Sequence, residues 1–153
     1  MQTPPKQLAP LLEIHEIDFS GKQILIADDE AINMMVTSKM LQARKAIISK
    51  ANNGYEVMQL LTEGLQPDLI LLDIKMPELD GFCTIRRIRQ EYPHLIVLAF
   101  TASFLDEQTE ALLREQGFYG SLSKSFKPQA FYNTIAEALE AAFNFTSLLQ
   151  KRR

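Results

Sequence analysis

Aspartates stand where two short apolar runs of the chain end. Asp28 and Asp29 follow the run at residues 23–27, and Asp73 closes the run at residues 69–73. If both runs are strands of one parallel sheet, their carboxyl ends meet at the edge where ligands bind in open α/β folds. Two carboxylates about 4 Å apart repel by about 4 kcal/mol at an effective dielectric of about 20, so the cluster needs a cation. Oxygen ligands alone favour Mg²⁺ or a similar hard ion.

Two further polar residues stand at the ends of later runs. Thr101 closes the run at residues 96–101, and Lys124 follows the run at residues 120–123. Each aspartate by itself has an ordinary structural explanation, because aspartate is common at helix N-caps and in turns. Polar side chains at four strand ends together favour a functional site over four separate structural roles.

The elements that position these residues alternate along the chain. Short apolar runs alternate with segments of helical period, which predicts β-α units and a parallel sheet buried on both faces. The predicted strands are residues 23–27, 46–49, 69–73, 96–101 and 120–123. Apolar residues at helical spacing predict five sheet-facing stripes: Ile32/Val36/Met40, Val57/Leu60/Leu61, Phe82/Ile85/Ile88, Leu105/Leu112 and Phe131/Ile135/Leu139.

Composition narrows the function classes. A chain of 153 residues with 46% hydrophobic and 23% charged residues predicts one globular domain. A net charge of −3 argues against direct nucleic-acid binding. Cys83 is the only cysteine, which excludes an internal disulfide and a multi-thiolate metal site and fits a reducing compartment. The longest apolar run, residues 95–100, is too short to span a bilayer.

From residue 22 to about residue 143, the chain resembles the receiver domain of two-component response regulators. The resemblance lies in four separated motifs: ILIADDE at 24–30, DLILLDIKMPELDG at 68–81, AFTA at 99–102 and LSK at 122–124. The lead-in FSGK at 19–22, with Ile32-Asn33 after the first motif, is similar to receivers at the C-terminus of hybrid sensor histidine kinases. We therefore expect an N-terminal linker at 1–20, a receiver domain at 21–145 and a C-terminal tail at 146–153.

The resemblance implies a fold and a set of roles. The implied fold is α/β and flavodoxin-like: a doubly wound parallel sheet of five strands in the order 2-1-3-4-5, with five flanking helices. Asp73 is the implied phosphoacceptor, and Thr101 and Lys124 are implied to contact the phosphoryl group. The implied Mg²⁺ ligands are the carboxylates of Asp29, Asp28 (mostly through water) and Asp73, with the backbone carbonyl of Lys75.

The expected function is that of a phosphoaccepting switch in a phosphorelay. Asp73 takes a phosphoryl group from a phosphohistidine, so the expected partner is a histidine kinase or a phosphotransfer protein. We expect the domain to catalyse its own modification and not to be an enzyme otherwise. We expect a cytoplasmic domain, free or as the cytoplasmic part of a membrane-bound sensor kinase, without membrane contact of its own; a homodimer is a further expected assembly. Two alternatives are a pseudo-receiver that acts only as an interaction module and a small phosphohydrolase.

Two residues depart from the pattern of the family. The family usually follows its lysine with a proline across a cis bond, whereas Ser125 follows Lys124 here, so we expect a trans bond. Lys127-Pro128 is a competing match for that lysine-proline pair, but Pro128 suits the first turn of a helix. Ser121 stands where the family commonly has an aromatic ring that moves with the threonine, which predicts weakened or rerouted coupling to the last strand.

Arg86, Arg87 and Arg89 are expected to form a solvated basic edge.

Overall fold

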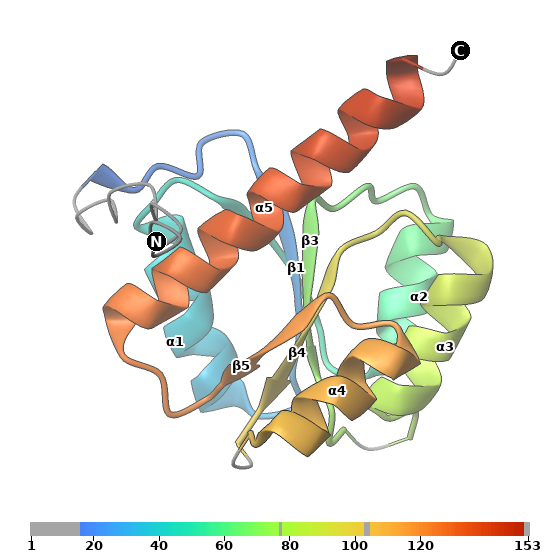
Figure 1. Ribbon diagram of the computed structural model, residues 1–153. Coiled ribbons are helices and arrows are strands. Elements are labelled where there is room, and N and C mark those ends of the chain that lie inside the picture. The colour runs from blue at the N-terminus through green and yellow to red at the C-terminus, as the bar shows by residue number, and fades with distance from the viewer. Residues whose placement is uncertain (1–15, 77, 103–104, 152–153) are drawn as a thin grey trace, which may run out of the picture.

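Five strands and five helices alternate along the chain (Figure 1). The computed structural model describes residues 16–76, 78–102 and 105–151, with residues 145–151 described by their backbone alone. The strands are β1 (Gln23–Ala27), β2 (Ile47–Ala51), β3 (Leu69–Asp73), β4 (Val97–Thr101) and β5 (Gly120–Ser123). The helices are α1 (Ala31–Gln42), α2 (Gly54–Thr62), α3 (Gly81–Glu91), α4 (Glu107–Gln116) and α5 (Pro128–Lys151).

The strands form one parallel sheet in the order β2-β1-β3-β4-β5. This is the flavodoxin-like arrangement that the sequence predicts, and three of the five strands have the predicted bounds. Every residue of the central strands β3 and β4 is buried, as expected of parallel strands covered on both faces. The parallel pairing brings the carboxyl ends of β1, β3, β4 and β5 to one edge of the sheet.

Two apolar clusters lie on opposite faces of the sheet. One packs α1 and α5 over side chains such as Ile26, Leu71 and Phe100, and the other packs α2, α3 and α4 over side chains such as Leu25 and Leu72. Figure 1 shows the same layers, with α1 and α5 on one side of the strands and α2 and α3 on the other. Both faces of each central strand are thereby removed from water, which fixes the strand ends that carry the polar residues.

The predicted sheet-facing stripe of α1 is wrong at Ile32 and Val36, whereas its third member, Met40, is partly buried and packs against the core. Ile32 is 72% exposed and Val36 is 44% exposed, whereas the helix buries Met34, Thr37, Ser38 and Leu41. The buried face therefore contains two small polar residues, which a search for apolar spacing passes over. The first turns of α1 instead present apolar side chains to solvent.

The predicted stripe of α4 is wrong by one residue. Asp106 caps this helix by accepting a hydrogen bond from the Thr109 N–H at 2.8 Å, so Leu105 precedes the helix. Leu113 is buried and the adjacent Leu112 is 47% exposed. Two neighbouring leucines offer the same apolar signal, and only the rotation of the helix set by its cap decides between them.

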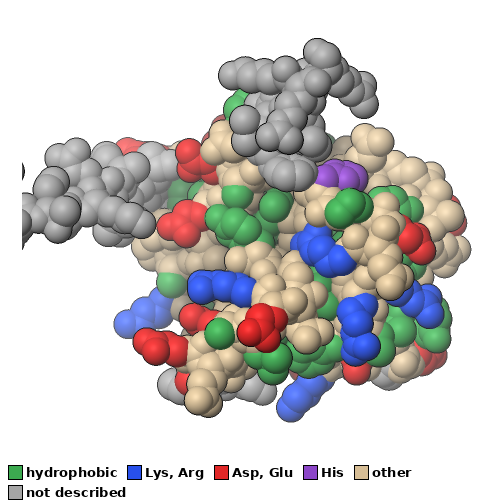
Figure 2. Space-filling view, turned by 45° about the vertical axis from the view of Figure 1, so that its right-hand side comes forward, with side chains coloured by type: hydrophobic (Ala, Val, Ile, Leu, Met, Phe, Trp, Pro, Cys, Tyr) green, Lys and Arg blue, Asp and Glu red, His purple; other side chains and the backbone are tan. Residues whose placement is uncertain are grey.

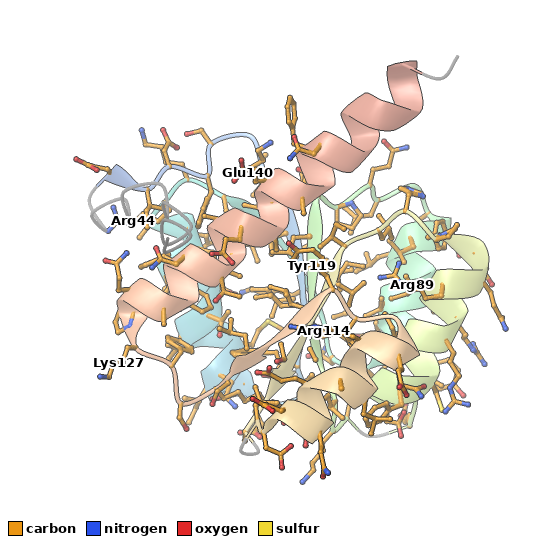
Figure 3. All side chains as sticks on the ribbon, viewed as in Figure 1. Arg44, Arg89, Arg114, Tyr119, Lys127 and Glu140 are labelled. Atoms are coloured by element: carbon orange, nitrogen blue, oxygen red, sulfur yellow. The ribbon has the colours of Figure 1, made fainter. Side chains whose placement is uncertain are left out.

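Arg89 does not belong to the solvated basic edge that the sequence predicts. Its guanidinium donates to the carbonyl oxygens of Gly117 at 2.8 Å, Leu95 at 2.7 Å and Pro93 at 3.2 Å. Figure 3 shows the side chain at the end of α3 that faces the β4 and β5 loops. Burial lowers the pKa of Arg89, which nonetheless stays charged at neutral pH. Arg89 thus ties the C-terminus of α3 to two later loops.

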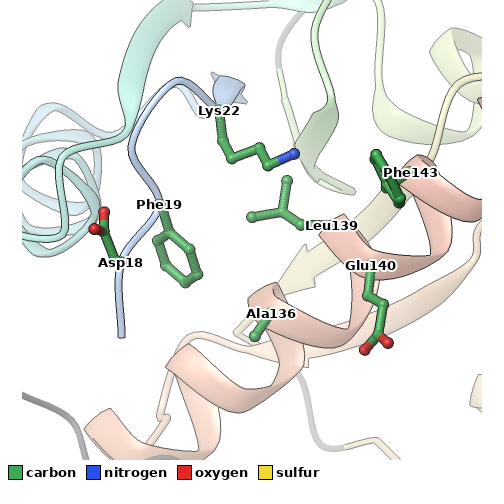
Figure 4. A pocket seen from close by; sticks show the side chains of 7 residues that line it. All are labelled: Asp18, Phe19, Lys22, Ala136, Leu139, Glu140 and Phe143. Carbon is green, nitrogen blue, oxygen red and sulfur yellow. The ribbon is translucent and has the colours of Figure 1, made fainter. Parts of the chain in front are cut away.

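The first described residues and the second half of α5 lie near the amino edge of the sheet. Ile17 and Phe19 are buried in the α1–α5 cluster, so the described part of the expected linker contacts the domain. Helix α5 continues without a break through the expected boundary at residue 145 and projects beyond the sheet (Figure 1). A hollow of about 270 Å³ separates Phe19 from Phe143 (Figure 4). No helix in the described part of the chain is both long and apolar enough to cross a membrane.

Candidate functional site

Three aspartates converge at the carboxyl edge of the sheet. Asp28, Asp29 and Asp73 each offer a carboxylate oxygen, and these oxygens lie within 4.8 Å of one another. Asp28 and Asp73 are 1% and 3% exposed, whereas Asp29 faces solvent. The cluster is therefore a buried pair of carboxylates with one open side, and the predicted convergence of these three residues is confirmed.

Backbone amides hold the two buried carboxylates in place. The Glu30 N–H donates to Asp28 Oδ1 at 2.9 Å, and the Lys75 N–H donates to Asp73 Oδ1 at 3.1 Å. The Asp28 N–H donates to the Ala51 carbonyl oxygen at 3.1 Å, which extends the pairing of β1 with β2 past the end of the strand. Each carboxylate thus keeps its second oxygen, Oδ2, for other partners.

Lys124 provides the positive charge of the site. Its Nζ lies 3.0 Å from Asp73 Oδ2, 3.0 Å from Asp28 Oδ2 and 4.0 Å from Glu30 Oε1. The Lys124 N–H donates to the Thr101 carbonyl oxygen at 2.8 Å, so the end of β4 positions this lysine. Lys127, the competing candidate, is exposed and points outward at the start of α5 (Figure 3).

The backbone after Lys124 follows the expectation from the sequence. None of the described residues has a cis peptide bond, so the bond from Lys124 to Ser125 is trans. The Ser125 N–H donates to Ser123 Oγ at 3.1 Å, which closes a short local turn. The lysine therefore reaches the carboxylates without the proline that the family usually has.

The pKa values of Asp73 and Lys124 are both raised, for opposite reasons. Burial raises the pKa of Asp73, and the hydrogen bond and charge of Lys124 offset that rise only in part. Burial alone would lower the pKa of Lys124, but its hydrogen bonds and ion pairs with Asp73 and Asp28 outweigh burial and raise it. Lys124 is thus held firmly in its charged form beside a carboxylate that is costly to ionise.

The donor set of the cluster fits a hard cation. All three side chains offer oxygen, and the Lys124 ammonium group pairs with only two of them, Asp28 and Asp73. Apart from the ion pair with Lys124, Asp28 Oδ2 has no hydrogen-bond partner among the described residues. The cluster could therefore hold a metal ion. The Lys75 side chain is exposed, and the role of its carbonyl oxygen as a metal ligand stays a prediction.

Thr101 lies beside this cluster on the next strand. It is the last residue of β4, is 4% exposed, and pairs in register with Ser123. The register of β3 with β4 places Asp73 opposite Phe100, one residue before Thr101. The predicted location of Thr101 at this edge is confirmed, and its contact with a phosphoryl group stays a prediction.

The surface next to the cluster has features that the sequence reasoning missed. Ile32, Met35 and Val36 are exposed on the first turns of α1, directly after the loop that carries Asp29. Apolar spacing assigned two of them to the core, so no signal in the sequence marked them as surface.

On the face shown in Figure 2, acidic, basic and apolar side chains are interspersed, without a continuous basic field.

Residues 24–136 match the family model of the response regulator receiver domain. The chain belongs to this family. The match covers most of the chain and includes all the residues of the carboxylate cluster and Lys124. The five-stranded order 2-1-3-4-5 agrees with a solved receiver domain, described as CheY-like, from Methanospirillum hungatei JF-1. The TM-score to that structure is 0.72 at 21% identity, over 80% of this chain and 97% of the other.

The relatives of this chain include a response regulator and a histidine kinase. The chain is 31% identical over 120 residues to the polar-differentiation response regulator DivK of Brucella anthropi, covering 77% of this chain and 96% of DivK. It is 29% identical over 144 residues to probable histidine kinase 5 of Oryza sativa subsp. japonica, covering 80% of this chain. The chain spans only 12% of the length of that kinase. Relatives thus include histidine kinases as well as a response regulator of single-domain size.

Proposed function

We propose that this receiver domain accepts a phosphoryl group on Asp73 from a phosphohistidine and signals through the resulting change in conformation. The observation that carries this proposal is the position of Lys124 Nζ, 3.0 Å from Asp73 Oδ2 and 3.0 Å from Asp28 Oδ2. A fixed ammonium group beside a buried carboxylate is suited to stabilising the charge of a transferring phosphoryl group. The proposed partner is therefore a histidine kinase or a phosphotransfer protein, because either carries the phosphohistidine that donates the group.

In the proposed transfer, an Asp73 carboxylate oxygen attacks the phosphorus atom. The new O–P bond forms as the N–P bond to the donor histidine breaks, and the imidazole leaves with the electron pair of that bond and takes up a proton. Lys124 pairs with the phosphoryl oxygens, and the Thr101 hydroxyl donates to one of them. Asp28, Asp29 and Asp73 would hold Mg²⁺, which supplies charge neutralisation for the phosphoryl oxygens when bound.

The signal is proposed to start at Thr101. Phosphorylation replaces one negative charge on Asp73 with about two and adds strong hydrogen-bond acceptors. The Thr101 hydroxyl then moves toward the phosphoryl group and carries the end of β4 with it. Ser121 on β5 has no ring to follow this movement, so we expect smaller changes on the outer face of β5 than next to Asp73.

We propose that the phosphodonor docks over α1. Ile32, Met35 and Val36 give this helix an exposed apolar face, and Asp29 at its start opens the cluster to solvent. A helix of the donor that covers this face removes apolar area from water while it presents its phosphohistidine to Asp73. We further propose that the domain is cytoplasmic, that it is divided into linker, receiver and tail as the sequence predicts, and that it can form a homodimer.

The pseudo-receiver remains the second candidate function. Ser121 and Ser125 favour it, because both replace residues that the family commonly uses in switching or in shaping the loop. The complete cluster of Asp28, Asp29, Asp73 and Lys124 favours the phosphoacceptor instead. Among the relatives, a protein-glutamate methylesterase/protein-glutamine glutaminase of Methanospirillum hungatei has an enzymatic name. We propose no such activity for this domain.

The deciding experiment is intact mass spectrometry after incubation with acetyl phosphate. We expect one phosphoryl adduct that forms only with Mg²⁺ and that is absent in Asp73→Asn. Glu137→Gln, an exposed substitution on α5, is the matched control and should form the adduct as the wild type does. A folded wild-type protein without an adduct would instead favour the interaction module.

A further inference from the structure

We propose that Gly54, at the start of α2, is a positioning residue for the β3–α3 loop and thereby for the Mg²⁺ site. This inference rests on the proposed function, because the loop carries the Lys75 backbone. The Gly54 N–H donates to the Leu79 carbonyl oxygen at 3.2 Å. Gly54 and Leu79 are both buried, so this hydrogen bond is shielded from water.

The absence of a side chain at position 54 is what permits this contact. A Cβ added to Gly54 would overlap Thr84 Oγ1 and lie 2.8 Å from the Leu79 carbonyl oxygen and 2.9 Å from Leu79 Cδ2. Gly54 does not have a positive φ, so glycine is needed here for space and not for backbone conformation. Any larger residue must push α2 away from the loop or move the loop itself.

The side chain of Asn53 adds a second link between α2 and the loop. Its Oδ1 accepts from the Glu56 N–H at 2.9 Å, which caps α2, and its Nδ2 donates to Glu78 Oε2 at 3.3 Å. Glu78 has a φ of 67°, so the loop turns sharply beside this link. One asparagine thus fixes the helix start and contacts the turn of the loop.

The other end of the loop is held next to Asp73. The Gly81 N–H donates to the Ile74 carbonyl oxygen at 3.0 Å, and the Lys75 N–H donates to Asp73 Oδ1 at 3.1 Å. A Cβ on Gly81 would lie 2.5 Å from the Asp73 carbonyl oxygen. Because hydrogen bonds hold the loop at both ends, we expect a shift at Leu79 to move the Lys75 backbone beside the phosphoacceptor.

The test separates two contacts that a Cβ at position 54 would make, one with Leu79 in the loop and one with Thr84 on α3. Gly54→Ala disturbs both, and the double variant Gly54→Ala/Thr84→Ala removes the hydroxyl that blocks the new methyl group while it leaves the clash with Leu79. We expect the double variant to melt within about 2 °C of Thr84→Ala. We also expect it to bind Mg²⁺ about tenfold more weakly by calorimetry, the size of effect typical of groups that orient metal ligands. The Lys75 and Leu79 amide resonances should shift in metal-free protein.

Gly120→Ala is the matched control, because its added Cβ would meet only Leu98 Cδ2, at the ordinary distance of 3.5 Å. It should leave Mg²⁺ affinity and both amide resonances unchanged. The inference is overturned if the double variant keeps the Mg²⁺ affinity and Lys75 resonance of Thr84→Ala. Failure of the wild type to bind Mg²⁺ would overturn the proposed function instead, and the metal-free resonances would still report whether Gly54 positions the loop. If Gly54→Ala alone does not fold, the double variant carries the test.

Discussion

At the scale of single residues, Lys124 and Lys127 give the clearest contrast. Lys124 Nζ contacts Asp73 and Asp28, whereas the Lys127 side chain points to solvent. We expect Lys124→Ala to slow Mg²⁺-dependent phosphorylation by acetyl phosphate about a hundredfold, the usual cost of removing one fixed group that stabilises developing charge. Lys127→Ala should react as the wild type does. Intact mass against time measures both rates, and equal defects in the two variants would refute the assignment of Lys124.

The raised pKa of Asp73 predicts how stability depends on pH. Folding favours the protonated carboxyl group, so the contribution of Asp73 to stability is present in acid and is lost as pH rises through its folded pKa. In metal-free buffer at about pH 7, Asp73→Asn should therefore raise the Tm by about 2–4 °C. The difference should disappear at about pH 3, where the wild-type carboxyl is protonated as well.

Asp106→Asn serves as the control, because the pKa of Asp106 is lowered whereas that of Asp73 is raised. Hydrogen bonds from Thr109 lower the pKa of Asp106, so its stabilising contribution is present at neutral pH and fades as pH falls through the folded pKa. Replacing this exposed cap should give no gain in stability at neutral pH. Calorimetric melts across the pH range follow both variants, and a pH-independent gain in Asp73→Asn would contradict the buried-charge explanation.

The sequence predicted most of the site at this scale. Asp28, Asp29, Asp73, Thr101 and Lys124 all end or follow strands, and the regular alternation of strands and helices is enough to bring such residues to one edge. The sequence could not predict that the ammonium group of Lys124 would bridge two carboxylates, because that depends on the side-chain rotamers. Nor could it predict the contact of Gly54 with Leu79, which joins the start of α2 to a loop 25 residues later.

At the scale of elements, Arg89 links α3 to the loops before β4 and β5. Its three hydrogen bonds go to backbone carbonyl oxygens in these loops. We expect Arg89→Ala to lower the free energy of unfolding by about 2 kcal/mol, since the substitution removes charge-assisted hydrogen bonds. Arg89→Lys should restore less than half of that loss, because one ammonium group cannot reach all three carbonyls.

The matched control for Arg89 is Arg86→Ala on an exposed face of the same helix. Arg86 makes one long hydrogen bond, 3.4 Å to the Phe82 carbonyl oxygen, so its removal should change stability by less than about 0.5 kcal/mol. Urea denaturation followed by circular dichroism measures all three variants. Equal losses in Arg86→Ala and Arg89→Ala would mean that helix propensity, and not the link between the loops, accounts for the effect.

The elements themselves were predicted well, and their rotations less well. Apolar spacing correctly assigns the buried face of α5, where Phe131, Ile135 and Leu139 all pack in the core. It fails for the first turns of α1 because the helix buries Thr37 and Ser38 while Ile32 and Val36 are exposed. Serine is close to alanine in size and threonine to valine, so both fit helix–sheet contacts and hydrophobicity alone does not define the buried face.

At the scale of the whole molecule, metal binding at one edge of the sheet should stabilise the entire domain. The cluster joins the ends of β1 and β3 and the residue after β5, three strands that share one cooperative core. A cation that binds the native cluster and not the unfolded chain adds about 2.7 kcal/mol at a concentration about a hundred times its Kd. The added stability should therefore appear as a Tm that rises with Mg²⁺ concentration.

Asp29 is the residue that tests this linkage most cleanly. It is the exposed member of the cluster, so Asp29→Asn should fold like the wild type in metal-free buffer yet show little rise in Tm when Mg²⁺ is added. Glu137→Gln removes an acidic group far from the cluster and should keep the full rise, which excludes a general effect of ionic strength. Differential scanning calorimetry over a series of Mg²⁺ concentrations measures both. An equal rise in Asp29→Asn and Glu137→Gln would show that Mg²⁺ stabilises the domain from somewhere other than the carboxylate cluster.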